Sequence, residues 1–519
     1  ATLVAAVLSL LLGAGIVAIA WQARVAARER DRARTEAARA ERVAEFVGGL
    51  FEAASPTSTG AGRTPLRELL DEGEAQLRSE LGAEPAVRGK LLEVLASAYA
   101  ALGESQRALA LAGEAVADLR RAVPLDGPAL ATALTTLAAT QIGQGTLDGA
   151  EPALREAQAL LRSAGLAESR RMARLHHYRG VLRTLAGDEQ GAEQLHREAL
   201  RLWRANGAEA DAAGELSRLA GRMDALGRPD EGLELKRQAL ESLRRVFGDD
   251  HPSVLNTRNN IGFSLHTRGR HAEAEAIYRE VLAGSEALLG GDHPGLADPL
   301  SNLGKVLMDQ GRFADAAPHV RRAAALRRRS VDENHFARIA TEMNLASLEL
   351  ALGGVEEAVA LYRSGLERFE RLTGAGSQPA ARCRSLLAIA LHRGGDPARA
   401  EPLLRSALVR QRQGGRPLDV ADTLAGLGSV LVDRARAEEA LPLLAEALDL
   451  RLPALAPEHW SIAELRVELG GALLGLGRHD EARAELASAA SVLASRDGHD
   501  WAQRRALRFA TPIEGRERS

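Results

Sequence analysis

Histidine next to proline recurs along the chain, and a repeated histidine is the first candidate for metal binding. GDDHPSVLNTRNNIGF spans residues 248–263, and GGDHPGLADPLSNLGK follows 42 residues later. His251 and His293 take the same place in the two segments, as His335 and His459 do in later ones. Packed helices lie about 8–10 Å apart, whereas zinc needs its ligands about 2 Å from one ion. Because proline suits the first turn of a helix, we predict that these histidines are helix N-caps.

A second histidine motif is the pair His176-His177. Successive residues of a helix point about 100° apart, so both imidazoles cannot easily reach one ion, and we expect surface or packing residues here. The sequence contains no glycine-rich phosphate loop, no Gly-x-Ser-x-Gly, His-Glu-x-x-His or Cys-x-x-Cys motif, and no kinase signature. We therefore predict no catalytic residue, no cofactor, no metal and no enzyme within this chain.

The composition favours helices with mixed surface charge. Of 519 residues, 45% are apolar and 3% aromatic, and the abundant Ala, Leu, Arg and Glu lose little in a helix. The 67 basic and 70 acidic residues are interspersed and give a net charge of −3, so nucleic acid is not an expected partner. A single cysteine, Cys383, excludes an internal disulfide.

A period of 42 residues organises most of the chain. A turn residue recurs at this spacing, with two steps of 40, at Gly103, Gly145, Gly187, Gly227, Gly269, Gly311, Gly353, Gly395, Ala435 and Gly477. A small residue stands seven places before each turn and another five places after it, as Gly262 and Ala274 do around Gly269. Because only Gly or Ala lets two helix backbones approach closely, we predict about ten antiparallel helix pairs over 66–497.

The region before the repeats has three predicted parts. Residues 1–21 carry no charge and are long enough for a transmembrane helix, although a cleaved signal peptide is the alternative. Residues 22–54 are predicted to form a polar helical stalk, and 55–65 a Pro/Gly/Ser linker. Residues 498–519 are expected to be a C-terminal tail. The chain is therefore predicted to be a single-pass membrane protein, with the side of the membrane left open.

The repeated columns resemble the tetratricopeptide repeat: leucine and a small residue, a turn glycine, an alanine, a bulky residue, and an alanine three places on. Units of 42 residues with an Asp-His-Pro start are similar to the lengthened repeats of kinesin light chains, most clearly over 248–365. The resemblance implies an all-α, right-handed superhelical solenoid whose first helices line a concave groove.

An asparagine column is the candidate site within that groove. Asn260, Asn302 and Asn344 occupy one column on the first helices of consecutive units, with Asn256 and Lys305 each one turn away. A side-chain amide donates and accepts hydrogen bonds as a peptide group does, so we predict that these five residues bind the backbone of a peptide or protein. The alternatives are polar residues on a solvated face and helix-to-helix hydrogen bonds within the stack.

The stretch before the repeats carries a second resemblance. WQARVAARERDRARTEAARAERVAEFVGGLFEAASP, residues 21–56, resembles the region after the catalytic domain in bacterial membrane-anchored serine/threonine kinases with carboxyl-terminal tetratricopeptide repeats. LRELLDEGEAQLRSEL, residues 66–81, is similar to the helix that opens the array in that group. The resemblance implies a kinase domain, with its ATP and Mg²⁺, upstream of Ala1.

The function expected from these features is a non-catalytic sensor or docking arm of such a kinase. Its partners would be a protein or peptide in the groove and a membrane through residues 1–21, with self-association left open. The alternatives are a membrane-tethered scaffold without a kinase and a secreted repeat protein. The sequence does not identify the ligand or the oligomeric state.

Overall fold

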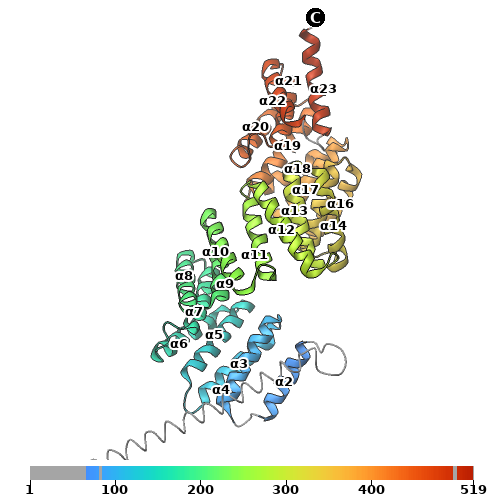
Figure 1. Ribbon diagram of the computed structural model, residues 1–519. Coiled ribbons are helices and arrows are strands. Elements are labelled where there is room, and N and C mark those ends of the chain that lie inside the picture. Colours follow the sequence, from blue (N-terminus) through green and yellow to red (C-terminus); the bar gives the residue numbers. More distant parts are fainter. Residues whose placement is uncertain (1–65, 81–83, 495–499, 518–519) are drawn as a thin grey trace, which may run out of the picture. The chain divides into compact units, whose positions relative to one another are not determined.

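The described part of the chain is built from helices and the turns that join them. The computed structural model describes residues 66–80, 84–494 and 500–517, and these contain 22 α-helices, two short 3-10 helices and no strand (Figure 1). The all-α helical repeat architecture predicted from the sequence is confirmed. The right-handed sense of the superhelix stays a prediction.

The chain divides into two compact units after Arg222, within α9. Unit 1 contains α2 (Leu66–Glu80), α3 (Pro85–Ala101), α4 (Ser105–Arg121), α5 (Gly127–Gln144), η1 (Leu147–Gly149), α6 (Ala150–Ser163), α7 (Arg170–Leu185), α8 (Glu189–Ala205) and most of α9 (Glu209–Ala225). Unit 2 begins with α10 (Pro229–Phe247), α11 (Pro252–His266), α12 (His271–Leu289), η2 (Pro294–Leu296), α13 (Ala297–Asp309), α14 (Phe313–Ser330), α15 (Phe336–Ala351) and α16 (Val355–Thr373). It continues with α17 (Gln378–Arg393), α18 (Pro397–Gln411), α19 (Pro417–Asp433), α20 (Ala437–Arg451), α21 (Trp460–Gly475), α22 (His479–Leu493) and α23 (Asp500–Glu517).

The turn within each helix pair uses a left-handed backbone conformation. Gly269 joins α11 to α12 with a φ of 73°, and Gly311 joins α13 to α14 with a φ of 76°. Every other glycine of the turn column also has a positive φ, and Ala435, with a φ of 56°, is the one non-glycine residue in this region among the described residues. Glycine has no Cβ and adopts this conformation without strain, so the column in the sequence reflects a backbone requirement.

The small columns lie where the two helices of a pair cross. Gly262 on α11 faces Tyr278 on α12, and a Cβ added to this glycine would lie 2.8 Å from the tyrosine ring. In the second column Ala274, Ala316 and Ala358 are fully buried. The small residues therefore make room for the bulky residue that follows the turn of the same pair, which a larger side chain would displace.

Histidine N-caps begin four helices of unit 2, as the sequence predicted. The Nδ1 atom of His251 accepts a hydrogen bond from the backbone N–H of Ser253 at 3.2 Å, and His293 accepts one from Gly295 at 3.0 Å. His335 and His459 cap α15 and α21 in the same way. Each imidazole satisfies an N–H group at a helix start that has no partner within the helix, so these histidines are structural.

The membrane part of the fold prediction is corrected. No helix among the described residues is both long enough and apolar enough to cross a bilayer. The proposed span at residues 1–21, the stalk at 22–54 and the linker at 55–65 all lie outside the described residues. A hydrophobic run of suitable length is a necessary feature of a membrane helix and not a sufficient one, because a signal peptide shares it. The single-pass membrane localisation is therefore withdrawn.

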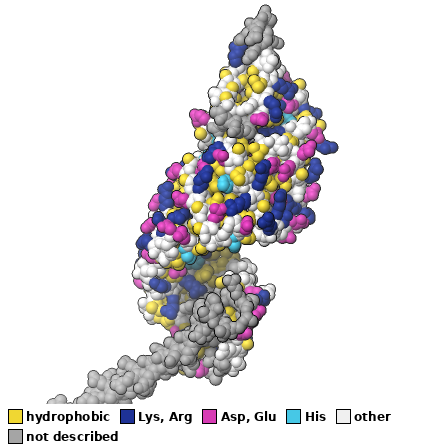
Figure 2. Space-filling model, turned by 45° about the vertical axis from the view of Figure 1, so that its right-hand side comes forward, with side chains coloured by type: hydrophobic (Ala, Val, Ile, Leu, Met, Phe, Trp, Pro, Cys, Tyr) yellow, Lys and Arg dark blue, Asp and Glu magenta, His cyan; other side chains and the backbone are white. Residues whose placement is uncertain are grey.

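The surface carries closely mixed charge. Basic and acidic side chains are interspersed over the face of the molecule in Figure 2. Many of them pair between neighbouring second helices, as Arg322 does with Glu286 and Arg412 with Glu446, each at 2.6 Å. Such exposed pairs contribute little stability, but they leave no extended basic surface in this view for a phosphate backbone.

Candidate functional site

The first helices of successive pairs form a continuous face of unit 2. α11 contacts α13, α13 contacts α15, and the series continues through α17, α19 and α21. The asparagine column therefore lies on neighbouring helices, with Asn260 on α11, Asn302 on α13 and Asn344 on α15. We refer to this side, built from the first helices, as the inner face.

Two of the three column asparagines bond to the preceding first helix. Asn302 donates a hydrogen bond through Nδ2 to Oδ1 of Asn259 at 2.9 Å, and Asn344 donates one to Oγ of Ser301 at 3.2 Å. Both side chains are half-buried. These amides act as helix-to-helix bonds, one of the alternatives that the sequence left open, while each carbonyl oxygen has no hydrogen-bond partner in the described part of the chain.

Of the other three predicted site residues, two are exposed to solvent and one forms an ion pair. Asn256 and Asn260 are exposed on α11, and Phe263 completes their face of the helix with 57% of its surface exposed. Lys305 on α13 pairs with Asp309 four residues on. The sequence analysis missed Phe263, although its place three residues after Asn260 puts both on one face of a helix. We call Asn256, Asn260 and Phe263 the α11 stripe.

Two segments of unit 2 that lie far apart in the sequence meet at one contact. The indole Nε1 of Trp460, at the start of α21, donates a hydrogen bond of 2.9 Å to the backbone carbonyl of Asp309, at the end of α13. The Trp460 ring packs edge-on against Phe313, 5.8 Å between centroids. The Asp309 carboxylate is bonded by His266 Nε2 at 2.7 Å. Residues 151 positions apart therefore meet at this contact.

The pKa values of two groups at this contact, Asp309 and His459, are shifted. Burial alone would raise the pKa of Asp309, but Lys305 and His266 hold it below its usual value. Burial lowers the pKa of His459, beside Trp460, to about 4. Both groups are thus in their unprotonated form at neutral pH, with His459 uncharged and Asp309 negative.

The inner face of the last pairs is covered by α23, within the segment expected to be a tail. Arg505 bonds both carboxylate oxygens of Glu468 on α21 at 2.6 Å and contacts Asp433 on α19 at 2.8 Å. Trp501 lies under the guanidinium of Arg393 on α17, 4.7 Å from the ring centroid. The α11 stripe is therefore a more open part of the inner face than α17, α19 and α21.

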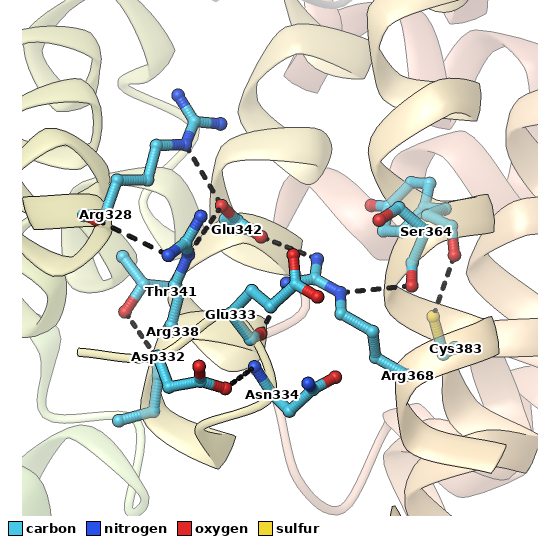
Figure 3. A network of polar contacts seen from close by, with 12 residues as sticks. Arg328, Asp332, Glu333, Asn334, Arg338, Thr341, Glu342, Ser364, Arg368 and Cys383 are labelled. Carbon is cyan, nitrogen blue, oxygen red and sulfur yellow. Dashed lines mark hydrogen bonds and ion pairs between the residues drawn. The ribbon is translucent and has the colours of Figure 1, made fainter. Parts of the chain in front are cut away.

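Buried carboxylates elsewhere in the described residues have arginine partners. Glu342 on α15 is bonded by Arg368 at 2.6 Å and by Arg328 at 3.0 Å, with Arg338 beside it (Figure 3). The same pairing with arginine occurs at Asp118, Glu349, Glu401 and Glu468. A buried ion pair of this kind satisfies both charges, which explains how these acids are tolerated in the stack.

Glu215 of unit 1 is different, because histidines take the place of arginine. Its Oε2 atom lies 2.7 Å from Nδ1 of His177, and its Oε1 atom lies 2.5 Å from Nδ1 of His196. Glu215 and His196 are each 2% exposed, and 15% of the His177 side chain is exposed. Burial would raise the pKa of Glu215, but the two histidine hydrogen bonds hold it below its usual value.

The repeat alignment contains a signal for this cluster, because two of its core columns hold polar residues here. His196 stands nine places after its turn, where other pairs have Tyr278 or Leu404, and it packs against Gly180 as Tyr278 packs against Gly262. Glu215 stands twelve places before its turn, in a column that is buried in every pair. Polar residues in two core columns could therefore have been flagged from the repeat alignment alone.

Comparison with known proteins gives one family. The tetratricopeptide repeat family matches residues 223–287, 253–329, 337–413 and 419–495, about half of the chain and all of it in unit 2. No curated protein matches the chain.

Solved structures share the fold. The apo form of the quorum sensor NprR from B. thuringiensis is 17% identical, with a TM-score of 0.51 over 70% of this chain and 98% of that chain. The apo form of RapI is 12% identical, with a TM-score of 0.57 over 70% and 97%. A putative kinesin light chain repeat protein from Podosopora anserina is 21% identical, with a TM-score of 0.30 over 39% and 98%. At these identities the likeness to NprR and RapI shows the fold alone.

Proposed function

Because the chain belongs to the tetratricopeptide repeat family, we propose that it is a non-catalytic interaction arm that binds an extended peptide or protein segment on the inner face of α11, α13 and α15. The observation that carries this proposal is the α11 stripe, in which two exposed amides precede, on one helix face, a phenylalanine with 57% of its surface exposed. An exposed aromatic residue beside hydrogen-bonding groups is a common feature of the centre of protein interfaces.

The chemistry of this surface suits a peptide backbone. Asn256 and Asn260 each offer a donor and an acceptor, matching the N–H and C=O groups of an extended chain. Asn302 and Asn344 are held in place by their bonds to the neighbouring helices, with their carbonyl oxygens left for a ligand's N–H groups. Holding a side chain in place before binding lowers the entropy lost on association.

The test uses peptides selected from a displayed random library on the full chain. We expect Phe263→Ala to weaken the selected peptide's Kd by about tenfold or more, since loss of an aromatic anchor costs about 1.4 kcal/mol or more. Asn260→Ala should weaken binding without changing the melting temperature. Fluorescence anisotropy with the labelled peptide gives the Kd, and circular dichroism gives the melting temperature.

A matched control is available on a second helix. Val409 on α18 is 65% exposed and does not lie on the inner face, so Val409→Ala should leave the Kd unchanged. Equal Kd values for Phe263→Ala and the wild type would contradict binding at the α11 stripe. A peptide that loses affinity only with Val409→Ala would place the interaction on the outer side.

We further propose that this arm serves a serine/threonine protein kinase. The support is the resemblance of residues 21–56, which lie outside the described residues. Reading the coding sequence upstream of Ala1 tests this directly. A glycine-rich loop, a lysine and a His-Arg-Asp motif are expected, whereas a short basic leader would favour the alternative of a scaffold without a kinase.

A further inference from the structure

One buried cluster of unit 1 is not used by the proposed peptide-binding function. His177 on α7, His196 on α8 and Glu215 on α9 each bring one potential ligand atom to within 4.8 Å of the other two. Both imidazoles approach the same carboxylate through Nδ1, at 2.7 Å and 2.5 Å. Three successive helices thus direct one side chain each to a common point.

The charge of this cluster is not balanced in the way that the molecule balances its other buried acids. Glu215 is 2% exposed, and neither an arginine nor a lysine pairs with it in the described part of the chain. The other five buried carboxylates there each pair with an arginine. Burying a carboxylate without a cation is costly, and a metal ion bound here would give Glu215 the positive charge that an arginine supplies at the other five carboxylates.

The two buried members of the cluster also depart from the repeat in a coordinated way. In the pairs from α11 onward, the column of His196 holds Tyr278, Val320 and Tyr362, followed by three leucines. The column of Glu215 holds uncharged residues in every other pair, among them Thr257 and Thr341. Apolar or hydroxyl side chains therefore fit both positions, so packing alone does not require a histidine and a glutamate here.

We propose that His177, His196 and Glu215 form a binding site for a divalent transition metal ion, of which zinc is the simplest probe. Two imidazoles and a carboxylate are a donor set typical of zinc, cobalt, nickel and iron, whereas calcium and magnesium prefer oxygen ligands throughout. Three protein ligands leave a fourth position for water or for a partner's side chain. His177 is the member with exposed surface, so the ion enters from its side.

Metal binding replaces the two hydrogen bonds of the cluster. Each imidazole must present the Nδ1 lone pair, so a ring whose Nδ1 carries the proton either moves it to Nε2 or, if fully protonated, releases one proton. The carboxylate remains ionised and supplies an oxygen to the ion. The side chains must also separate from 2.5–2.7 Å, because ligand atoms about 2 Å from one tetrahedral ion lie about 3.3 Å from each other.

The experiment titrates the full, metal-free chain with zinc and with cobalt. We expect a single ion per chain, a rise in melting temperature of about 5–10 °C at zinc concentrations well above the Kd, and the visible absorption of a cobalt ion with nitrogen and oxygen ligands. The variant Glu215→Gln should bind at least about tenfold more weakly.

A double variant keeps the test independent of folding defects. His196→Leu with Glu215→Thr places in unit 1 the residues that unit 2 uses in the same columns, so it is expected to fold and not to bind zinc. The control His293→Asn removes an exposed histidine that caps a helix, and it should retain the zinc response. No change in the wild-type melting temperature with zinc, or an equal response in the double variant, would overturn the proposal. Because peptide binding is assigned to unit 2, its failure would leave this result unaffected.

Discussion

One helix pair of unit 1 fills its core differently from the pairs of unit 2 that run from α11 to α22. From α11 to α22 the bulky column packs apolar or tyrosine side chains against small residues, as Tyr278 does against Gly262. In unit 1 the pair α7–α8 places His196 against Gly180 in the same way, and Glu215 of the following helix, α9, bonds to this histidine. All matches to the tetratricopeptide repeat family begin at residue 223 or later, so they lie in unit 2.

This difference shows that the repeat restricts the volume of the side chain at this position but not its chemistry. A glycine at the crossing accepts any side chain of suitable volume, so it accepts an imidazole as readily as a phenol ring. The imidazole then needs a hydrogen-bond partner, because an unsatisfied buried polar group costs about 1–3 kcal/mol. Glu215 is that partner, and this pair thereby gains a polar centre at a position where the pairs from α11 onward have tyrosine or apolar side chains.

The largest loss of stability is expected when one of the two buried members of the polar centre is replaced and the other is kept. His196→Leu alone leaves Glu215 buried with only His177, and we expect it to destabilise the metal-free chain by about 2–4 kcal/mol. Adding Glu215→Thr should restore most of that loss, because Thr257 and Thr341 occupy the same column in unit 2. Denaturant unfolding of the wild type, both single variants and the double variant gives the coupling energy.

The outcome decides whether the two cores are interchangeable. A large coupling energy between His196 and Glu215 would show that the cluster acts as one unit. Additive effects of the two substitutions would instead show that the histidine and the glutamate are tolerated separately, and the comparison between the units would lose its basis.

A smaller effect is expected from acidification, and its main contribution should come from His459 in unit 2. The pKa of His459 is lowered to about 4 by burial, against about 6.5 in an unfolded chain. Between these values the unfolded state binds more protons, so stability falls as the pH falls from about 6.5 to 4. Burial also lowers the pKa of nearby His271, which acts in the same direction. Glu215 has a pKa below its usual range and contributes only at lower pH.

His459→Asn tests this assignment while keeping a capping side chain. We expect the drop in melting temperature between pH 7 and pH 5 to shrink by about 2–4 °C in this variant. The control His293→Asn changes an exposed histidine cap of the same type and should keep the full wild-type drop. If the melting temperature of His459→Asn dropped as much as that of the wild type, His459 would not be the source of the acid sensitivity.

The repeat architecture was predictable because its requirements recur. A left-handed turn and a close helix crossing each restrict a position to small residues, and ten registers repeat that restriction, including Ala435 at the one turn without glycine. The histidine caps were predictable for the same reason, since His251 and its counterparts stand beside a proline or a helix start.

The site was less predictable because it depends on single contacts between helices. Asn302 and Asn260 share a column, yet one bonds Asn259 across the stack and the other faces solvent. The sequence pattern suggests His176 as the neighbour of His177, whereas the hydrogen-bond partner of His177 is Glu215, 38 residues away. The membrane prediction failed for another reason, because it rested on the length and the lack of charge of residues 1–21.

Amide hydrogen exchange on the full chain tests most directly the central claim, that unit 1 holds a metal centre and unit 2 a peptide surface. Zinc and the selected peptide would be added separately. Zinc is predicted to slow exchange in α7, α8 and α9 and the peptide in α11, α13 and α15, each without an effect on the other set. Protection of the same helices by both additions, or of neither set, would contradict the account.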